Sequence, residues 1–229
     1  MKKIFNSLPL IVTHLFLFFL TSCTIQKTSS PPHLISPSVL KNGDLIFVGA
    51  LDEGLSGAIK RATILEGSYN YDHVGIVERT TNGIYVLHAA PKGGSQREEL
   101  NQFYTLRKTE QNSIIVYRLK KNYTFAIPHA ITQASTMLGK PYNWTYILNE
   151  NEYYCSDFVE RAFRKDQIFE HIPMNFKNKS SGEIDTYWIE FYTNLNQSVP
   201  QGYPGTNPNQ LSQSSKLEMV GSLELYLTK

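Results

Sequence analysis

Only two cysteines occur in this 229-residue chain, and the sequence around each of them indicates a separate role. Cys23 ends an apolar N-terminal segment. Cys155 begins a stretch with apolar residues at helical spacing, Cys-Ser-Asp-Phe-Val-Glu-Arg-Ala-Phe. Neither cysteine is then available for a disulfide, so the hydrophobic core has to hold the fold together.

The first 22 residues show the order of features of a bacterial lipoprotein signal. Lys2 and Lys3 precede an apolar run at residues 8–20, and Leu-Thr-Ser-Cys follows at 20–23. This resembles the lipobox, which implies cleavage after residue 22 and lipidation of Cys23. A membrane-spanning helix is the alternative, but the run is shorter than the ~20 apolar residues that cross a bilayer. Thr24, in place of Asp, favours sorting to the periplasmic face of the outer membrane.

The rest of the chain divides into a tether and one domain. Residues 23–39 are rich in Ser, Thr and Pro, which predicts a flexible tether. Residues 40–229 are enough for one domain with a substantial core and too few for two. Without Lys2 and Lys3, the 22 basic residues fall to 20, equal to the 20 acidic residues. This balance, without a basic patch, does not point to nucleic acid as a partner.

Within the domain the pattern is typical of an α+β protein, with strands first and helices later. We expect strands at 45–48, 73–77, 84–89 and 113–119, because each is a short run rich in apolar and β-branched residues. We expect helices at 55–65 and 126–138, and a third from residue 155. The turn residues at 80–83 predict a hairpin between the second and third strands. The sequence after 165 gives no clear pattern.

Two histidines fall on the same face of this expected hairpin. Strand alternation puts His73 and Gly75 on one face, and His88 on the matching face of the next strand. If residues 80–83 form a four-residue loop, Arg79 pairs with Ile84, and His73 is the diagonal neighbour of His88. A two-residue Asn-Gly turn would keep both histidines on that face but out of register.

A thiol at a helix start and two imidazoles are the groups needed for nucleophilic catalysis by a cysteine. The helix N-terminus and a nearby imidazolium would lower the pKa of Cys155. His73 would take the thiol proton, and His88 would orient the His73 ring. A lone thiol outside the cytoplasm is prone to oxidation, so we expect Cys155 to be present for its reactivity. A cysteine that only packs in the core is the alternative.

Several motifs resemble a known enzyme family. His-Val-Gly-Ile-Val, followed after a hairpin by Val-Leu-His-Ala, resembles the histidine strands of the NlpC-type cell-wall peptidases of the papain-like superfamily. The cysteine helix follows these strands here, as in the circularly permuted branch that includes YiiX and YaeF. Similar motifs in the same order span the domain: Asn-Gly-Asp-Leu-Ile-Phe (42–47), Leu-Gly-Lys-Pro-Tyr-Asn (138–143), Tyr-Cys-Ser-Asp-Phe-Val (154–159) and Pro-Gly-Thr-Asn-Pro (204–208). The resemblance implies a permuted papain-like fold, an antiparallel sheet or small barrel packed against helices.

The resemblance also implies a site. It makes Cys155 the nucleophile, His73 the general base and His88 the orienting third residue, with the Cys155 N–H as an oxyanion donor. Tyr154 and Tyr142 are expected to bind substrate, as pocket walls or as a second oxyanion donor. Stem-peptide peptidases carry an Asp directly before the cysteine to meet the substrate amine. Tyr154 stands there in this chain, and Asp157 is the nearest acidic candidate.

The expected function is a lipid-anchored cysteine amidase or peptidase of the bacterial cell envelope. Its substrates would be small peptides or other amides, including peptidoglycan fragments, and it would contact the membrane through its lipid. An acyltransferase or lipid hydrolase is one alternative, which an apolar tunnel beside Cys155 would favour. A non-catalytic envelope lipoprotein is another. A zinc site of His73, His88 and Cys155 is conceivable, but no further metal motif supports it, and we expect neither metal nor cofactor.

Overall fold

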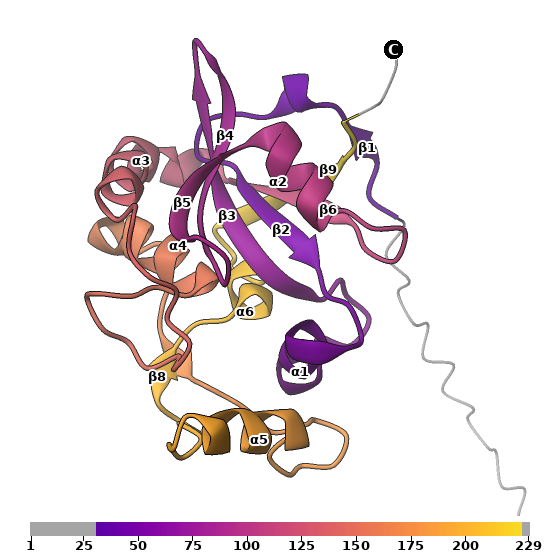
Figure 1. Ribbon diagram of the computed structural model, residues 1–229. Helices are drawn as coiled ribbons and strands as arrows, with labels where there is room; N and C mark the ends of the chain where they lie inside the picture. The colour runs from indigo at the N-terminus through magenta and orange to yellow at the C-terminus, as the bar shows by residue number, and fades with distance from the viewer. Residues whose placement is uncertain (1–30, 226–229) are drawn as a thin grey trace, which may run out of the picture.

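A mixed sheet with helices on both faces forms the domain, as seen in a computed structural model that describes residues 31–225 (Figure 1). The sheet has seven strands in the order β1-β9-β6-β2-β3-β4-β5, and β7 and β8 form a separate pair. The elements are β1 (Leu34–Ile35), β2 (Leu45–Gly49), α1 (Gly54–Thr63), β3 (Tyr71–Thr80), β4 (Gly83–Ala90), β5 (Gly94–Glu99), α2 (Leu100–Arg107), β6 (Ile114–Leu119), α3 (Ile127–Thr136), α4 (Cys155–Phe163), β7 (Ile172–Pro173), α5 (Thr186–Asn194), β8 (Pro204–Gly205), α6 (Pro208–Ser212) and β9 (Leu217–Leu223).

The hairpin of β3 and β4 has the register predicted for the four-residue loop. Arg79 pairs with Ile84, and Thr80 with Gly83, so the turn itself is shorter. A Cβ on Gly75 would lie 3.0 Å from the Cβ of His88. That close approach explains the glycine, because a side chain would collide with the neighbouring strand.

The two faces of the sheet carry different cores. Alternate residues of β3 enter opposite clusters, with Val74 and Ile76 on one face and Val77 on the other. The first cluster includes the inward side of α4, and the second includes Phe103 of α2. Figure 1 shows α2 crossing one face of the sheet, with α3 and α4 beside β4 and β5. The two helices that matter for the site therefore pack on opposite faces.

Two expectations about the architecture are corrected. The sheet is open, with β1 and β5 at its edges among the described residues, so the small-barrel alternative is wrong. Residues 34–39 of the segment expected as a tether belong instead to the domain, because Ile35 is buried and β1 pairs in parallel with β9. The signal segment and Cys23 lie outside the described residues. Within residues 31–225, no helix has the length and hydropathy needed to cross a bilayer.

The first turn of the domain is held by a buried ion pair. Asp44 is 1% exposed and receives two hydrogen bonds from Arg118 of β6, each 2.7 Å long. The backbone N–H of Lys41 donates to the same carboxylate at 2.7 Å. This connects the Asn-Gly-Asp motif at 42–44 to a strand more than 70 residues later in the chain.

Substitution of Asp44 should destabilise the domain strongly. Asp44→Asn leaves the Arg118 guanidinium without its counter-charge, and breaking a buried pair in this way costs about 3–5 kcal/mol. The free energy of unfolding from urea titration measures the loss. Asp52→Asn, which removes the exposed partner of Lys60, is the control and should leave the titration midpoint unchanged. Equal effects of the two substitutions would contradict the assignment.

Candidate active site

Cys155 is the first residue of α4, the most deeply buried helix at the site. Tyr154 precedes the helix in an extended conformation and offers no side-chain cap. The apolar side chains of α4 that enter the core with strands β3 and β4 are Phe158, Val159, Ala162 and Phe163. This packing fixes the helix and presents its N-terminus, with its unsatisfied N–H groups, to the sheet. The Cys155 side chain is positioned by the fold, and the residue is only 4% exposed.

The sulfur of Cys155 lies against the backbone of β3 next to His73. Its Sγ is 3.8 Å from the carbonyl oxygen of Asp72, in the peptide group that joins Asp72 to His73. The backbone N–H of Val74, on the other side of His73, also interacts with the sulfur. The thiol is thus beside both peptide groups that flank His73.

This contact is made at the edge of β3 that faces β4. The N–H of Val77 donates to the carbonyl of Asp44, ahead of β2. Because backbone groups alternate between the two edges of a strand, those of Asp72 and Val74 face β4. The ladder between β3 and β4 ends at Ile76, however. The sulfur therefore sits where the two strands have stopped pairing.

The two histidines meet on the other face of this opening. His73 Nε2 and His88 Nδ1 are 3.0 Å apart, and the two rings are nearly perpendicular. Phe103 of α2 covers both rings, with centroids 6.1 Å from His73 and 5.2 Å from His88. The predicted shared face of the histidines is confirmed. Cys155 approaches from the α4 side and the imidazoles from the α2 side, so the site depends on the opening between them.

A carboxylate that the sequence reasoning missed continues the line of hydrogen bonds. Glu98 Oε2 lies 3.1 Å from His88 Nε2 and accepts a hydrogen bond of 2.8 Å from Arg107 Nη1. Glu98 is on β5, where it pairs opposite Val86 and lies diagonal to His88. The Gly-Gly pair at 93–94 was the available signal, because it marks a second hairpin directly after the histidine strand.

These contacts determine which ring nitrogens carry protons. Burial raises the pKa of Glu98, but the His88 hydrogen bond and the Arg107 charge outweigh it and hold the pKa below its usual range. An ionised Glu98 only accepts, so His88 donates from Nε2 and accepts at Nδ1. His73 then donates from Nε2, which leaves its Nδ1 unprotonated. In this tautomer Nδ1 is a base.

Burial keeps both the Cys155 thiol and the His73 imidazole uncharged at rest. Burial lowers the pKa of His73 well below 6.5. Burial also raises the pKa of Cys155 to about 12, and the Asp72 carboxylate adds to the shift, against the N–H groups of Val74, Ser156 and Cys155. The expected low thiol pKa is therefore not found, because desolvation exceeds the effect of the helix terminus. Thiol and imidazole are both uncharged.

A narrow pocket opens beside Cys155, with a volume of about 30 Å³. Tyr142 and Tyr154 line it, as do residues of the motif at 204–208 and aromatic side chains of the later segments. The hydroxyl of Tyr154 accepts from the N–H of Thr206 at 3.1 Å, and the Tyr142 hydroxyl lies 3.4 Å from that of Tyr146. The two tyrosines are pocket walls with engaged hydroxyls.

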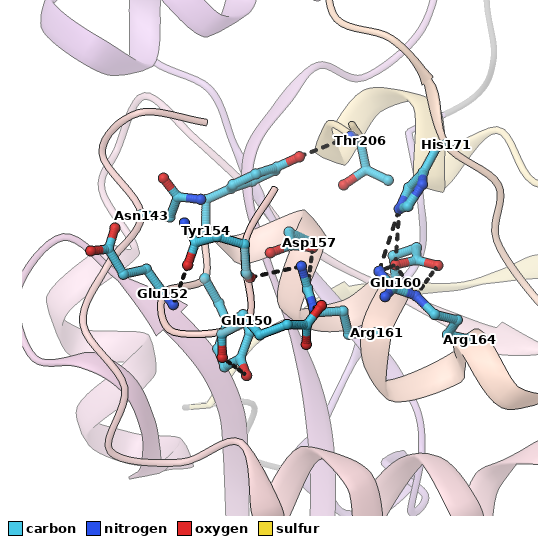
Figure 2. Close-up of polar contacts among 12 residues, drawn as sticks. Asn143, Glu150, Glu152, Tyr154, Asp157, Glu160, Arg161, Arg164, His171 and Thr206 are labelled. Carbon is cyan, nitrogen blue, oxygen red and sulfur yellow. Dashed lines mark hydrogen bonds and ion pairs between the residues drawn. The ribbon is translucent and has the colours of Figure 1, made fainter. Parts of the chain in front are cut away.

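Asp157 lies away from this pocket. It is fully buried, and Arg161 donates to its Oδ1 at 2.7 Å (Figure 2). Arg161 also binds Glu150 and the carbonyl of Asn149, which connects α4 to the preceding loop. Asp157, expected as a substrate-binding residue, does not line the pocket beside Cys155, and its carboxylate faces Arg161 instead.

Over residues 31–225, no group of three or more His, Cys, Asp or Glu side chains is placed to hold a metal ion. Three polar atoms around the pocket are buried without a hydrogen-bond partner: Ser156 Oγ, Thr206 Oγ1 and Trp188 Nε1. These neutral groups suit an organic ligand better than a cation of high charge.

Comparison with known proteins agrees with this fold. A solved structure with a similar fold is that of the metalloprotein yiiX from Escherichia coli O157:H7, with 20% sequence identity and a TM-score of 0.65. The match covers 81% of this chain and 98% of that one. No curated protein matches. A family model described as permuted papain-like amidase enzyme, YaeF/YiiX, C92 family, matches residues 39–221. The chain belongs to this family of permuted papain-like amidases, as its motifs predicted.

Proposed function

We propose that this protein hydrolyses an amide bond with Cys155 as nucleophile, His73 as general base and His88 as the residue that orients His73. The observation that carries the proposal is the contact of the Cys155 sulfur with the peptide groups on both sides of His73. The family to which the chain belongs supports an amidase. The line of hydrogen bonds from His73 to Glu98 supports the assignment of the base.

The reaction follows from the tautomer. As the sulfur attacks the substrate carbonyl, His73 Nδ1 accepts the thiol proton, so the charge appears only when the bond forms. The Cys155 N–H at the helix start stabilises the oxyanion. His73 then protonates the leaving amine, and the C–N bond breaks to give a thioester. Water, deprotonated by the same imidazole, hydrolyses the thioester and restores the thiol.

The cellular setting is part of the proposal. The signal-like residues 1–22 and Cys23 support a lipid-anchored enzyme at the periplasmic face of the bacterial outer membrane. Small peptides or other amides, including peptidoglycan fragments, are then the available substrates. The neutral balance of charges supports substrates other than nucleic acid.

One observation favours a second candidate, an acyltransferase or lipid hydrolase. The pocket beside Cys155 is walled by aliphatic and aromatic side chains, including Ile59, Phe176 and Trp188. An acyl chain could be held by such walls. The volume of about 30 Å³, however, is too small for a long chain without rearrangement. Release of fatty acid from lipid vesicles, with no hydrolysis of amides, would establish this candidate instead.

Loss of the thiol should abolish turnover without loss of the fold. Cys155→Ala is expected to reduce amide hydrolysis to the uncatalysed background, because no nucleophile remains. His73→Ala should reduce kcat by about 10²–10⁴-fold, the usual contribution of a general base. Mass spectrometry of products from aminoacyl amides and cell-wall digests measures both. Full turnover by Cys155→Ala, with unchanged circular dichroism, would exclude the nucleophile.

Substitution of Glu98 should reduce kcat and leave KM nearly unchanged. Glu98→Gln keeps the shape but offers both a donor and an acceptor, so His88 no longer holds one tautomer. We expect kcat to fall about 10- to 100-fold, which is the usual cost of losing a hydrogen-bonding residue that holds an active-site side chain in its orientation. Glu99→Gln, at the exposed neighbour, is the control and should match the wild type. A change in KM alone would contradict the positioning role.

The acid limb of the pH profile should lie below pH 6.5. The pKa of His73 is held well below 6.5 by burial, and catalysis needs this imidazole unprotonated. Activity is therefore retained as the pH falls to 6.5 and is lost only when the pH passes the depressed pKa. Measuring kcat/KM from pH 4 to 9 tests this. An acid limb above pH 7 would contradict the neutral resting state.

A further inference from the structure

A carboxylate that forms no salt bridge among the described residues lies at the pocket beside the sulfur. Asp72 lines the pocket together with Cys155, and among the described lining residues it is the only one of the types Asp, Glu, Lys, Arg or His. Within residues 31–225, no salt bridge joins Asp72 to a cation. Burial raises the pKa of Asp72 to about 6, and the hydrogen bond with Ser56 and the charge of Arg107 offset this only in part. Arg61, for example, forms its salt bridge with Asp185 rather than with Asp72.

This carboxylate disfavours ionisation of the Cys155 thiol. Its charge is, after burial, the largest cause that raises the pKa of the Cys155 thiol. A negative charge near a thiol opposes formation of the thiolate and of the oxyanion that follows. A cation bound during the reaction would remove that penalty.

The same pocket offers neutral groups that have no partner. Ser156 Oγ and Thr206 Oγ1 are each about 1% exposed as residues and make no hydrogen bond. Hydroxyl oxygens can accept from an ammonium group, whereas the N–H of Trp188 can only donate and suits a carbonyl oxygen. Buried polar atoms left in this way cost free energy until a ligand or water pairs with them.

We propose that the pocket binds the primary ammonium group of the amide substrate, with Asp72 as its counter-charge. The substrate class is then short aminoacyl or peptidyl amides with a free amino group close to the bond that is cut. This rests on the proposed function and adds the substrate class to it. The volume of about 30 Å³ accommodates a group of the size of water or ammonium. Asp72 takes the role expected of an acidic residue before the cysteine, where this chain has Tyr154.

Binding would also activate the nucleophile. An ammonium group beside Asp72 cancels the carboxylate field, so the thiol pKa falls only when a substrate is present. A thiol that stays protonated in the empty pocket is protected from oxidation, because oxidants attack the thiolate. Substrates without the amine would be cut slowly even when they fit.

The test compares two thiol reagents of matched size and opposite charge. 2-Aminoethyl methanethiosulfonate carries a primary ammonium, and 2-sulfonatoethyl methanethiosulfonate carries a sulfonate. Each forms a disulfide with Cys155 and releases methanesulfinate. The ratio of the two rates, read by mass on the peptide that contains Cys155, cancels the intrinsic reactivity of the thiol. We expect the ratio in the wild type to exceed that in Asp72→Asn by at least about tenfold.

Two further measurements keep the test decisive. Glu110→Gln removes the same charge from an exposed loop and should leave the ratio at the wild-type value. The wild-type chain in urea serves as reference if Asp72→Asn does not fold, and its ratio should be lower than that of the folded protein. Equal ratios in folded wild type, Asp72→Asn and unfolded chain would overturn the proposal, as would a folded thiol inert to both reagents.

Amide substrates separate this inference from the proposed function. Wild-type enzyme should cut an L-alanyl anilide at least about tenfold faster than its N-acetyl form, and Asp72→Asn should remove the preference. Cleavage of both forms at equal rates would refute the ammonium site and leave the cysteine amidase standing. Failure to cut any amide, with the reagent ratio as expected, would refute the amidase and leave a cation-binding pocket.

Discussion

The end of pairing between β3 and β4 is the constraint on which the site depends. Cys155 and the imidazoles come from opposite faces of the sheet, and a continuous ladder would keep them apart. Because the ladder ends at Ile76, the N-terminus of α4 can place its first side chain at the free edge of β3. The core on one face of the sheet holds α4 against this opening, and the core on the other face holds α2 against it.

The hydrogen-bonded side chains run from a charged ion pair at the outer end to an uncharged imidazole next to Cys155. Arg107 and Glu98 form an ion pair at the outer end, His88 carries the hydrogen bond inwards, and His73 presents a lone pair. A buried ion pair contributes little net stability in general. Here the ion pair fixes one tautomer of His88 and, through it, one tautomer of His73. This supports a role in keeping His73, the proposed base, unprotonated at Nδ1. In the proposed mechanism, charge separation is postponed to the chemical step.

Local patterns in the sequence were enough to predict the centre of the fold. Strand alternation placed His73 and His88 on one face, and the apolar spacing after Cys155 predicted the helix, both of which the structure confirms. Glu98 could not be placed because β5 is a polar edge strand, whose residues lack the apolar alternation that marks a strand. The end of the β3–β4 ladder was also beyond reach, since it is imposed by packing against α4. The sequence did not show that Asp157 faces Arg161, because the contact depends on how α4 is oriented in the core.

The parallel pairing of β1 with β9 brings the beginning and the end of the domain together. The N–H of Ser222 donates to the carbonyl of His33, and that of Glu224 to the carbonyl of Ile35. Figure 1 shows β9 beside β1. A short linker could therefore join the two ends, and new ends could be opened in the exposed loop ahead of α4. Such a rearranged gene would encode the helix before the strands, the order of the unpermuted relatives, with every contact of the site retained. Chain order and spatial order are thus separable in this architecture.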